Sequence, residues 1–580
     1  MQEKIIQSKH CKHCNTPFDI SDTDLEFYEK VSPVIGGVKY NIPTPTLCPD
    51  CRQQRRFTFR NERKLYKRIC DFSGKEIVSI YSPDKPYTVY DNDIWWSDKW
   101  EALDYGVDFD FDLPAFDQFD DLMKKVPFQK SFTTISCENS EYGNHTGELK
   151  DCFLCFATWA SENTHYSTRT TNTKDSLDLL WADKLSNCYQ CVGCINSNKC
   201  FYSKNCSDSY NLISCIDCVG CSDCILCTNL NGKKYCIENK QYSKEEYFVN
   251  KKLLIKKIFK EGWNGLKEIE TKMIHKNLDI INSQNCLGDN ISNCKNSYYV
   301  FDVADIQDCK YSILSTDQAN NVYDAIGFGA KLDKGYELVD VGLNGYLNCF
   351  CIVCHNNSNI FYSMNCYNSN NLFLCVGLRN KSYCILNKKY TKEEYEALVL
   401  KIIDNMIEEG DPTSPRFRGT GWGEFFPSII SPFGYNETIA MEYFPLIKED
   451  AKEKCFNWSD YEASFPKVEK VIKANMLPDD IKDIPDDILN WAIESEIVST
   501  EVFNPLYRII AQELEFYRKH NLPIPRRHPD QRHLDRMSLR NPRKLFDRKC
   551  DKCRTDIKSS YSPERPEKVY CEDCYNKEVY

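Results

Sequence analysis

A six-residue period between Cys188 and Cys236 constrains the fold of this chain more than any other feature of its sequence. Every sixth residue there is Cys or Leu, the next position is mostly apolar, and the third position after it is mostly Cys or Ser. The preceding position is usually Asn or Asp, which favour turns. Ladders of small and apolar residues between polar corners are typical of a β-solenoid, in which equivalent short strands stack. The residues at the six-residue interval are Cys188, Cys194, Cys200, Cys206, Leu212, Cys218, Cys224, Leu230 and Cys236.

The solenoid pattern occurs in two copies along the chain. The sequence KYCI at 234–237 recurs as SYCI at 382–385, and an amphipathic helical pattern follows each copy. Ser243 and Thr391 begin capping boxes at the starts of these helices, and a glycine ends each of them. The period leaves the coil length open, since three six-residue sides would make a triangular coil of eighteen residues and two would make a flatter coil of twelve.

The composition restricts the class of this 580-residue chain. The formal net charge of −11 argues against a chain that is basic overall, although local basic segments exist. The first ten residues are polar and no run is long enough for a transmembrane helix, so we expect a cytoplasmic protein with no membrane partner. In a reducing cytosol, the 33 cysteines are expected to be thiols or metal ligands rather than disulfides.

Two pairs of cysteines near the start of the sequence have the spacing of a zinc site. Cys11 and Cys14 form one CxxC knuckle, and Cys48 and Cys51 form a second. Each knuckle supplies two thiolates from a tight turn, and together they complete the tetrahedral coordination of Zn²⁺. Because four cysteines leave no open coordination position, we predict a structural rather than a catalytic zinc.

A basic segment follows the second knuckle directly. Eight of the seventeen residues from Arg52 to Arg68 are Arg or Lys, and aromatic residues are interleaved with them. Such a strip is suited to phosphate contact with aromatic stacking on nucleic acid. The alternative is a solvated face whose arginines pair with nearby carboxylates, and the sequence leaves both open. The candidate nucleic-acid residues here are Arg52, Arg55, Arg56, Arg60, Arg63, Lys64 and Arg68.

The last part of the sequence is a second copy of the first part. The thirty residues from Ile42 align without gaps on the thirty from Leu522, an offset of 480 residues. The second copy lacks the counterparts of Cys48 and Cys51 but has four cysteines further on, which predict a second structural zinc. Its basic strip is retained. The ligands are Cys550, Cys553, Cys571 and Cys574, and the candidate nucleic-acid residues are Arg532, Arg536, Arg540, Arg543, Lys544 and Arg548.

These features predict a mainly β chain. Two duplicated β-solenoid halves, each followed by a helix, are flanked by two homologous zinc-ribbon-like modules of α+β type. The predicted segments are a zinc-ribbon module with its basic strip at 1–69, a metal-less ribbon copy with an aromatic and acidic cap at 70–136, the first solenoid half with its helix at 137–270, the second at 271–410, a linker rich in Pro, Gly and aromatic residues with short helices at 411–500, and the second zinc-ribbon module at 501–580.

Several longer motifs accompany the knuckles and the cysteine hexads. They are LCPDCRQQRR, CDFSGKEIVSIYSPDKPY and RNPRKLFDRKCDKC. Through them, most of the chain resembles a family of large, uncharacterised cysteine-repeat zinc-ribbon proteins of small-genome environmental bacteria and giant viruses. Some members carry a CaiB/BaiF-type CoA-transferase label. That fold is α/β with a Rossmann-like core and a catalytic Asp, and no such βαβ pattern is visible here, so the resemblance names relatives without supplying a function.

The favoured function is a non-enzymatic scaffold with two structural zinc ions that binds nucleic acid, RNA in particular, through its two basic strips. The alternative is a scaffold that docks protein partners, because solenoid surfaces are extended and zinc ribbons serve as docking modules. We infer no small-molecule substrate from the sequence.

Two remoter alternatives are an iron–sulfur protein and a transferase. Cys188–Cys200 invites comparison with an iron–sulfur protein, but the spacing lacks the fourth Cys-Pro of ferredoxins, and Ile360 stands at a hexad position of the second copy, which favours packing. A solenoid acyltransferase or other transferase would use a histidine between coils, with His145, His165 and His355 as candidates. None of them belongs to a convincing catalytic constellation, so the sequence favours a protein without enzymatic activity but leaves the question open.

Overall fold

The computed structural model describes residues 3–133, 136–315, 317–463, 465–496 and 504–579, which form a mainly β protein with many strands in long sheets. The chain divides into two compact units, and each unit combines two segments that are distant in the sequence. Unit 1 contains Met1–Lys130 and Leu278–Tyr461, and unit 2 contains Ser131–Asn277 and Glu462–Tyr580. The first cysteine-knuckle segment therefore shares a unit with the second set of stacked strands, and the last segment shares a unit with the first set.

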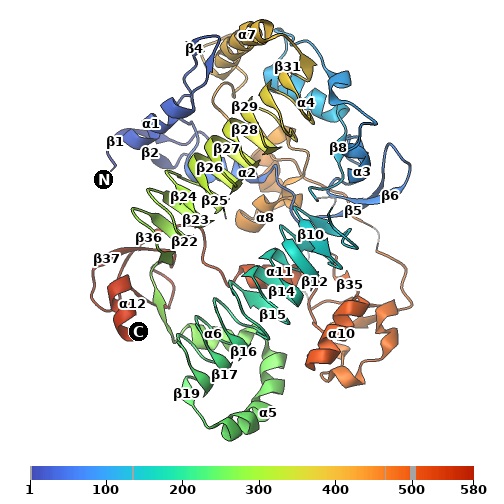
Figure 1. Cartoon of the computed structure of the whole chain (residues 1–580), viewed down its shortest axis with the longest axis vertical. Helices are drawn as coiled ribbons and strands as arrows, with labels where there is room; N and C mark the ends of the chain where they lie inside the picture. The colour runs from blue at the N-terminus through green and yellow to red at the C-terminus, as the bar shows by residue number, and fades with distance from the viewer. Residues whose placement is uncertain (1–2, 134–135, 316, 464, 497–503, 580) are drawn as a thin grey trace. The chain divides into compact units, whose positions relative to one another are not determined.

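Unit 1 is built around a run of parallel strands, which we call the second ladder (residues 280–389; Figure 1). Its strands are β21 (Ile280–Ile281), β22 (Leu287–Ser292), β23 (Tyr298–Ala304), β24 (Ile306–Gln307), β25 (Ile313–Ser315), β26 (Ala319–Gly329), β27 (Leu332–Gly342), β28 (Tyr346–His355), β29 (Ser358–Phe361), β30 (Asn370–Phe373), β31 (Ser382–Ile385) and the antiparallel β32 (Lys388–Lys389). The main elements packed around it are β1 (Ile5–His10), β2 (Pro17–Ser21), α1 (Asp22–Val31), α2 (Pro49–Phe57), β5 (Tyr66–Ile69), β6 (Glu76–Ser79), α4 (Ala115–Lys125) and α7 (Lys392–Gly410).

Unit 2 is built around the first ladder (residues 143–241) in the same way. Its strands are β9 (Gly143–Asn144), β10 (Gly147–Lys150), β11 (Cys155–Phe156), β12 (Trp159–His165), β13 (Thr168–Thr171), β14 (Lys174–Asp183), β15 (Tyr189–Val192), β16 (Tyr210–Ile213), β17 (Ser222–Ile225), β18 (Lys234–Ile237) and the antiparallel β19 (Lys240–Gln241). Around it lie α5 (Lys244–Glu261), α6 (Trp263–Glu270), α10 (Ala511–His520), α11 (Pro529–Met537), β36 (Phe546–Lys549), β37 (Asp556–Ser559), β38 (Lys568–Tyr570) and α12 (Glu572–Val579).

The strands of both ladders pair in parallel with a register offset of twelve residues. Leu212 pairs with Cys224, and Cys224 pairs with Cys236. One repeat of the ladder is therefore two hexads long, the shorter of the two lengths that the sequence left open. In the second ladder the offset is eleven residues at the start, as between Ile280 and Ile291, and thirteen in the middle, as between Tyr323 and Tyr336.

Within each twelve-residue repeat, every third residue has left-handed backbone geometry. From Asn187 to Glu238, each third residue has a φ between +46° and +66°. This conformation costs a non-glycine residue about 1–2 kcal/mol, and Asn and Asp tolerate it best. The Asn and Asp residues that the sequence suggested as turn formers occupy these positions. Their side chains also bond along the ladder, as between Asn196 and Asp208, where the amide nitrogen lies 2.6 Å from the carboxylate oxygen.

The residue after each left-handed position points into the ladder, and most of these residues are small, with Leu212 and Leu230 among the larger ones. Cysteines and serines fill this interior from Cys188 to Cys236, and almost all of them are buried. Their side chains also accept hydrogen bonds from backbone N–H groups. The backbone N–H group of Cys215 donates to the Ser203 hydroxyl group twelve residues earlier, at 3.4 Å, and that of Cys200 donates to the Cys188 sulfur at 3.4 Å. The six-residue pattern of the sequence is therefore two steps of a three-residue period.

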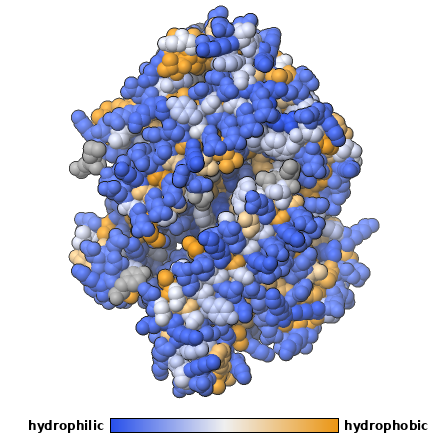
Figure 2. Space-filling view, viewed as in Figure 1, coloured by the Kyte–Doolittle hydropathy of each residue, from blue (hydrophilic) through white to orange (hydrophobic). Residues whose placement is uncertain are grey.

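The apolar position of the pattern faces outward and is covered on one side. In unit 2, Tyr189, Phe201 and Ile213 form a buried column with residues of α5 and α10. The two predicted capping boxes are present at Ser243 and Thr391, where α5 and α7 begin. No helix among the described residues is long and apolar enough to cross a membrane, and the face in Figure 2 is largely hydrophilic.

Candidate metal centres and the arginine helices

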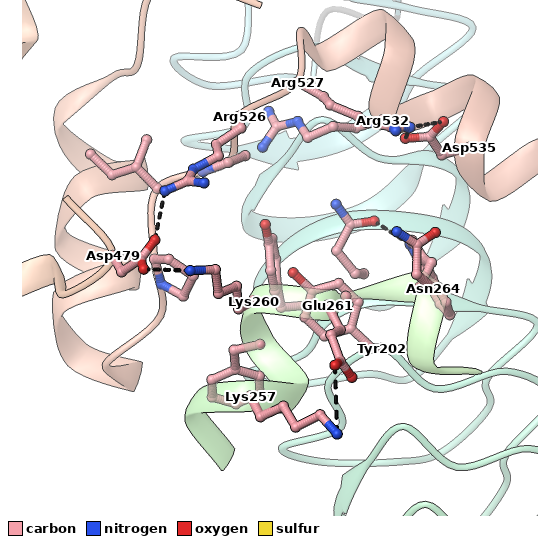
Figure 3. A pocket seen from close by; sticks show the side chains of 18 of the residues that line it. Tyr202, Lys257, Lys260, Glu261, Asn264, Asp479, Arg526, Arg527, Arg532 and Asp535 are labelled. Carbon is pink, nitrogen blue, oxygen red and sulfur yellow. Dashed lines mark hydrogen bonds and ion pairs between the residues drawn. The ribbon is translucent and has the colours of Figure 1, made fainter. Parts of the chain in front are cut away.

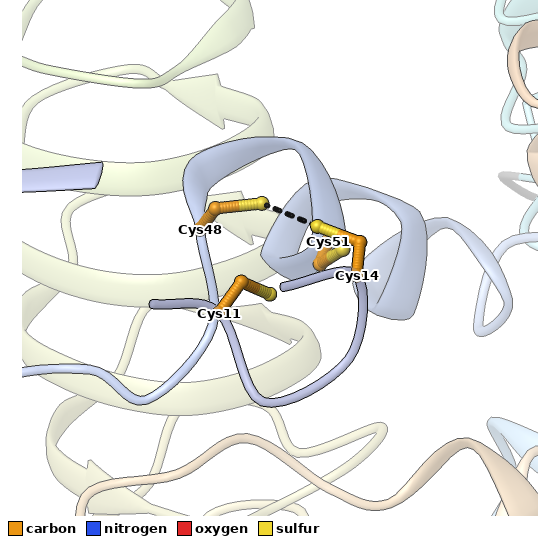
Figure 4. A group of neighbouring side chains, drawn as sticks. All are labelled: Cys11, Cys14, Cys48 and Cys51. Carbon is orange, nitrogen blue, oxygen red and sulfur yellow. Dashed lines mark hydrogen bonds between the residues drawn. The ribbon is translucent and has the colours of Figure 1, made fainter. Parts of the chain in front are cut away.

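The four cysteines of the first predicted zinc site lie together in unit 1 (Figure 4). Cys11 and Cys14 lie in the turn after β1, Cys48 immediately precedes α2, and Cys51 lies in its first turn. The four sulfur atoms are within 4.8 Å of one another, and those of Cys14 and Cys48 are 3.7 Å apart. Cys51 donates a hydrogen bond that lowers the pKa of Cys48 to about 5, so this group favours the thiolate that binds a metal.

The second predicted site is assembled in unit 2. The turn after β36 supplies Cys550 and Cys553, and the start of α12 supplies Cys571 and Cys574. The sulfur atoms of Cys553 and Cys571 are 3.7 Å apart. Two backbone N–H groups, those of Cys553 and Cys571, donate to the Cys550 sulfur at 3.5 and 3.3 Å. The Thr555 hydroxyl group is the main cause that lowers the pKa of Cys553 to about 6.

Both groups fit a tetrahedral metal ion. Four thiolates at about 2.3 Å from Zn²⁺ are about 3.8 Å apart, close to the separations seen here. Two four-cysteine groups can thus hold one metal ion each, and sulfur ligands alone leave no position for substrate or water. Within the described ranges, these are the two groups of at least three Cys, His, Asp or Glu side chains with such geometry. The ladder cysteines are not among them, and Cys188 instead donates to the carbonyl groups of Ser186 and Ser197 at 3.3 and 3.7 Å.

The arginines of α2 are buried against acidic residues of the second ladder. Arg52 lies 2.9 Å from Asp324, and Arg56 lies 3.2 Å from Asp324 and 2.6 Å from Glu337. Both guanidinium groups are only 1% exposed. Burial opposes the charged form of Arg52, but the carboxylate of Asp324 outweighs it and raises the pKa of Arg52 well above its ordinary value. Arg55 pairs with Glu337 and Glu424 at 2.8 and 2.9 Å.

The arginines of α11 repeat this arrangement in unit 2. Arg532 and Arg536 lie 2.9 and 2.8 Å from Asp178 of the first ladder. Arg536 also donates to the Gln190 side chain at 3.1 Å, in the position that Glu337 occupies in unit 1. These are the residues that the 480-residue offset matches to Arg52 and Arg56. In each unit, the arginines of the basic strip therefore hold the cysteine module against the ladder.

This burial corrects the prediction of a nucleic-acid surface for seven of its residues. A guanidinium group enclosed with carboxylates has neither the access nor the unpaired charge that phosphate contact needs. Arg60 pairs with Glu62 and Asp340, and Arg68 pairs with Asp71 at 3.0 Å. The seven residues are Arg52, Arg55, Arg56, Arg60, Arg68, Arg532 and Arg536.

The other candidate basic residues lie nearer the surface. Arg63, Lys64 and Arg543 are half-buried. Lys544 is exposed, with its amine over the Phe546 ring, and the Arg540 guanidinium group lies 4.7 Å from the Trp181 ring. Arg548 pairs with Asp551 at 3.1 Å.

The acidic partners Asp178, Asp324 and Glu337 were missed by sequence reasoning. They stand at left-handed positions of the ladder, where Asp and Asn are also common for conformational reasons. Only the docked arginines distinguish them from the exposed corner residues.

The candidate histidines lie beside amide and aromatic side chains. His165 is buried, its Nε2 lies 3.1 Å from the Asn163 side chain, and burial lowers its pKa to about 4. His355 stacks on Tyr367 with ring centroids 5.7 Å apart, and His145 lies against Phe132.

No family model matches the chain, and no curated protein matches it. Among solved structures, a putative acetyltransferase from Desulfovibrio desulfuricans G20 is similar at 8% sequence identity and a TM-score of 0.11. The match covers 39% of this chain and 63% of that one, so the chain spans less than two thirds of the acetyltransferase.

Proposed function

We propose that this protein is a non-enzymatic scaffold with two structural zinc ions, which docks protein partners on its ladder surfaces. The supporting observation is the burial of the paired arginines. Because Arg52 and Arg532 anchor the cysteine modules to acidic ladder residues, the modules stabilise their units instead of offering charge to nucleic acid. Zinc is the metal that suits four thiolates in a closed tetrahedral site.

We also infer that each ladder is a β-solenoid with twelve-residue coils. The register of twelve residues in the first ladder, and of eleven to thirteen in the second, supports this inference together with the left-handed residue at every third position. Such a repeat returns the chain to the same place after four short sides. An extended outer surface is then the part of the molecule available to a partner.

Nucleic-acid binding stays a second candidate, because the Arg540–Lys549 segment keeps exposed basic residues such as Lys544 and Lys549. The two functions make opposite predictions. We expect the purified full chain to contain two zinc ions and no iron, and to leave a fluorescein-labelled 30-nucleotide RNA unbound at low salt. RNA affinity that falls steeply with salt and is lost in Lys544→Glu would overturn the docking function in favour of the nucleic-acid one.

A further inference from the structure

Basic side chains of unit 2 differ in whether they have an acidic partner. In the polar cavity of about 820 Å³ beside α5, Asp479 lies 2.8 Å from Lys260 and 2.6 Å from Arg526 (Figure 3). Lys233 and Lys240 lie instead at the last coil of the first ladder, and both are exposed. Neither of them forms an ion pair with any residue that the structure describes. The end of the first ladder therefore carries uncompensated positive charge.

The last coils of the two ladders match residue by residue. The sequence KKYCIENKQYS at 233–243 aligns without gaps on KSYCILNKKYT at 381–391. The antiparallel strand that ends each ladder, β19 or β32, pairs in the same register. The Asn239 amide group donates to the carbonyl oxygen of Thr228 at 2.9 Å. Its counterpart Asn387 donates to the carbonyl oxygen of Val376 at 2.7 Å, so the two ladder ends have the same local structure.

In unit 1 the ladder end is covered by an acidic segment of the same chain, Glu101–Asp108 (EALDYGVD), which we call the ladder cap. Glu101 lies 2.7 Å from Lys381, and Asp108 lies 2.6 Å from Lys388. The hydrogen bond from Lys388 is the main cause that lowers the pKa of Asp108, so this carboxylate stays ionised. The two ends of the ladder cap are thus fixed by two ion pairs.

Backbone hydrogen bonds hold the ladder cap between these ion pairs. The backbone N–H group of Val107 donates to the carbonyl oxygen of Leu386 at 3.1 Å. The carbonyl oxygen of Ala102 accepts from the side-chain amide group of Asn387 at 3.1 Å. The cap lies so close to the ladder that a Cβ atom at Gly106 would be 2.7 Å from the carbonyl oxygen of Asn387. Asn387 is completely buried as a result.

The end of the first ladder keeps the groups that hold a cap but is left uncovered. Lys233 stands at the position of Lys381, and Lys240 stands at the position of Lys388. Asn239 is exposed, although its counterpart in unit 1 is buried. Within the described part of unit 2, no segment takes the place of the ladder cap on these lysines.

Two differences between the ladder ends leave these groups unchanged. Arg379, which donates to two carbonyl groups upstream of the ladder cap, is replaced by Asn231. Leu386 is replaced by Glu238, whose side chain is exposed. The added negative charge is offset by the exposed Lys234, where unit 1 has a serine. The last coil of the first ladder is therefore still basic.

We propose that this ladder end binds a segment of a partner protein that has two carboxylates seven positions apart and a glycine two positions before the second one. The proposal rests on the docking function proposed above and names its site and the chemistry of the partner. One carboxylate binds Lys233 and the other binds Lys240. Because neither lysine has an ion pair to give up, the charge complementarity favours binding without loss of an internal contact.

The test uses the full chain and a fluorescein-labelled peptide with the sequence of the ladder cap, EALDYGVD, measured by fluorescence anisotropy. We expect saturable binding that weakens as the salt concentration rises. Replacing the glutamate of the peptide by Gln and its last aspartate by Asn should weaken binding about tenfold or more. Replacing its glycine by Val should weaken binding too, because the close approach to the ladder leaves no room for a side chain.

The protein variant is Lys233→Glu with Lys240→Glu, which should lose peptide binding. Both side chains are exposed, so urea unfolding should be unchanged and lost binding is not lost folding. The matched control is Lys150→Glu with Lys174→Glu, the same charge change at exposed positions of the same ladder, and it should bind the peptide as the unaltered chain does.

Two results would overturn the proposal. They are absence of peptide binding and equal binding by the unaltered chain and the Lys233→Glu, Lys240→Glu variant. A protein partner that binds this variant as well as it binds the unaltered chain would remove only this site and leave the docking function standing. RNA binding that the same variant abolishes would instead overturn both.

Discussion

The guanidinium group of Arg536 lies 2.8 Å from the carboxylate of Asp178, and neither side chain is exposed to solvent. The two residues come from segments that are 358 positions apart. Asp178 also pairs with Arg532, which has a second buried partner in Glu513 at 3.3 Å, so two carboxylates compensate two buried cations of the same helix. The last cysteine module is therefore attached to the first ladder by charge that water cannot screen.

Asp178→Asn should strongly destabilise unit 2. The substitution keeps the size of the side chain but removes the counter-charge of the buried Arg536 and leaves Arg532 with Glu513 alone, which costs about 3–5 kcal/mol. Urea unfolding measures the loss. The matched control is Asp547→Asn, which removes an exposed pair with Lys558 in the same unit and should cost less than about 1 kcal/mol. Equal losses in the two variants would show that the buried pair does not anchor the module.

Ser203→Leu should destabilise the first ladder by about 2–4 kcal/mol. The larger side chain overfills the interior and removes the hydroxyl group that accepts from the backbone N–H group of Cys215. Ser203→Cys is the matched variant and should be nearly neutral, because Cys188 plays the same role for Cys200. Thermal unfolding distinguishes them. A neutral Ser203→Leu would contradict a tightly packed interior.

Asn205→Val tests the left-handed positions. Asn205 is exposed and has a φ of +52°, so a β-branched residue there should cost about 1–2 kcal/mol without any lost packing. Asn205→Gly should cost less, because glycine adopts this geometry without strain. If the two variants have the same free energy of unfolding, backbone conformation is not what selects Asn at these corners.

Cys48→Ser and Cys571→Ser test the metal centres separately. Each should reduce the zinc content from two ions per chain to one and unfold its own module, because metal binding supplies the folding free energy of such small modules. Hydrogen exchange should show lost protection near α2 for the first variant and near α12 for the second, with the ladders still protected. Loss of protection over the whole chain in either variant would contradict this modularity.

The stability of unit 2 should fall in mild acid. Burial lowers the pKa of His165 to about 4, whereas an unfolded histidine titrates near 6.5. Between these two values the unfolded chain binds a proton that the folded chain does not, so stability falls as the pH drops through this window, by up to about 3 kcal/mol. His165→Gln should reduce this dependence in pH-resolved urea unfolding, and the part that remains should fall further in His165→Gln with His520→Gln, because burial also lowers the pKa of His520 to about 4.

The sequence predicted the mainly β class, the two four-cysteine groups and the capping boxes at Ser243 and Thr391 because each depends on local spacing. It showed small residues midway between the hexad positions but did not predict left-handed geometry at every third residue, because residues such as Lys199 and Tyr202, which are not turn formers, also have it. The burial of seven arginines of the basic strips was not predicted for a different reason. Their partners, such as Asp178 and Asp324, lie hundreds of residues away, and nothing local distinguishes a buried cation from a solvated one.

The pairing of distant segments within each unit has a consequence for the order of synthesis. The ribosome releases residues 1–130 long before their ladder at 280–389, and it releases the first ladder long before α11. Arg52 is therefore synthesised before its partner Asp324, and Asp178 before its partner Arg536. Neither unit can reach its final packing on the nascent chain until most of the protein has emerged. We therefore expect folding intermediates with unpaired charges that last long enough for chaperones to bind them.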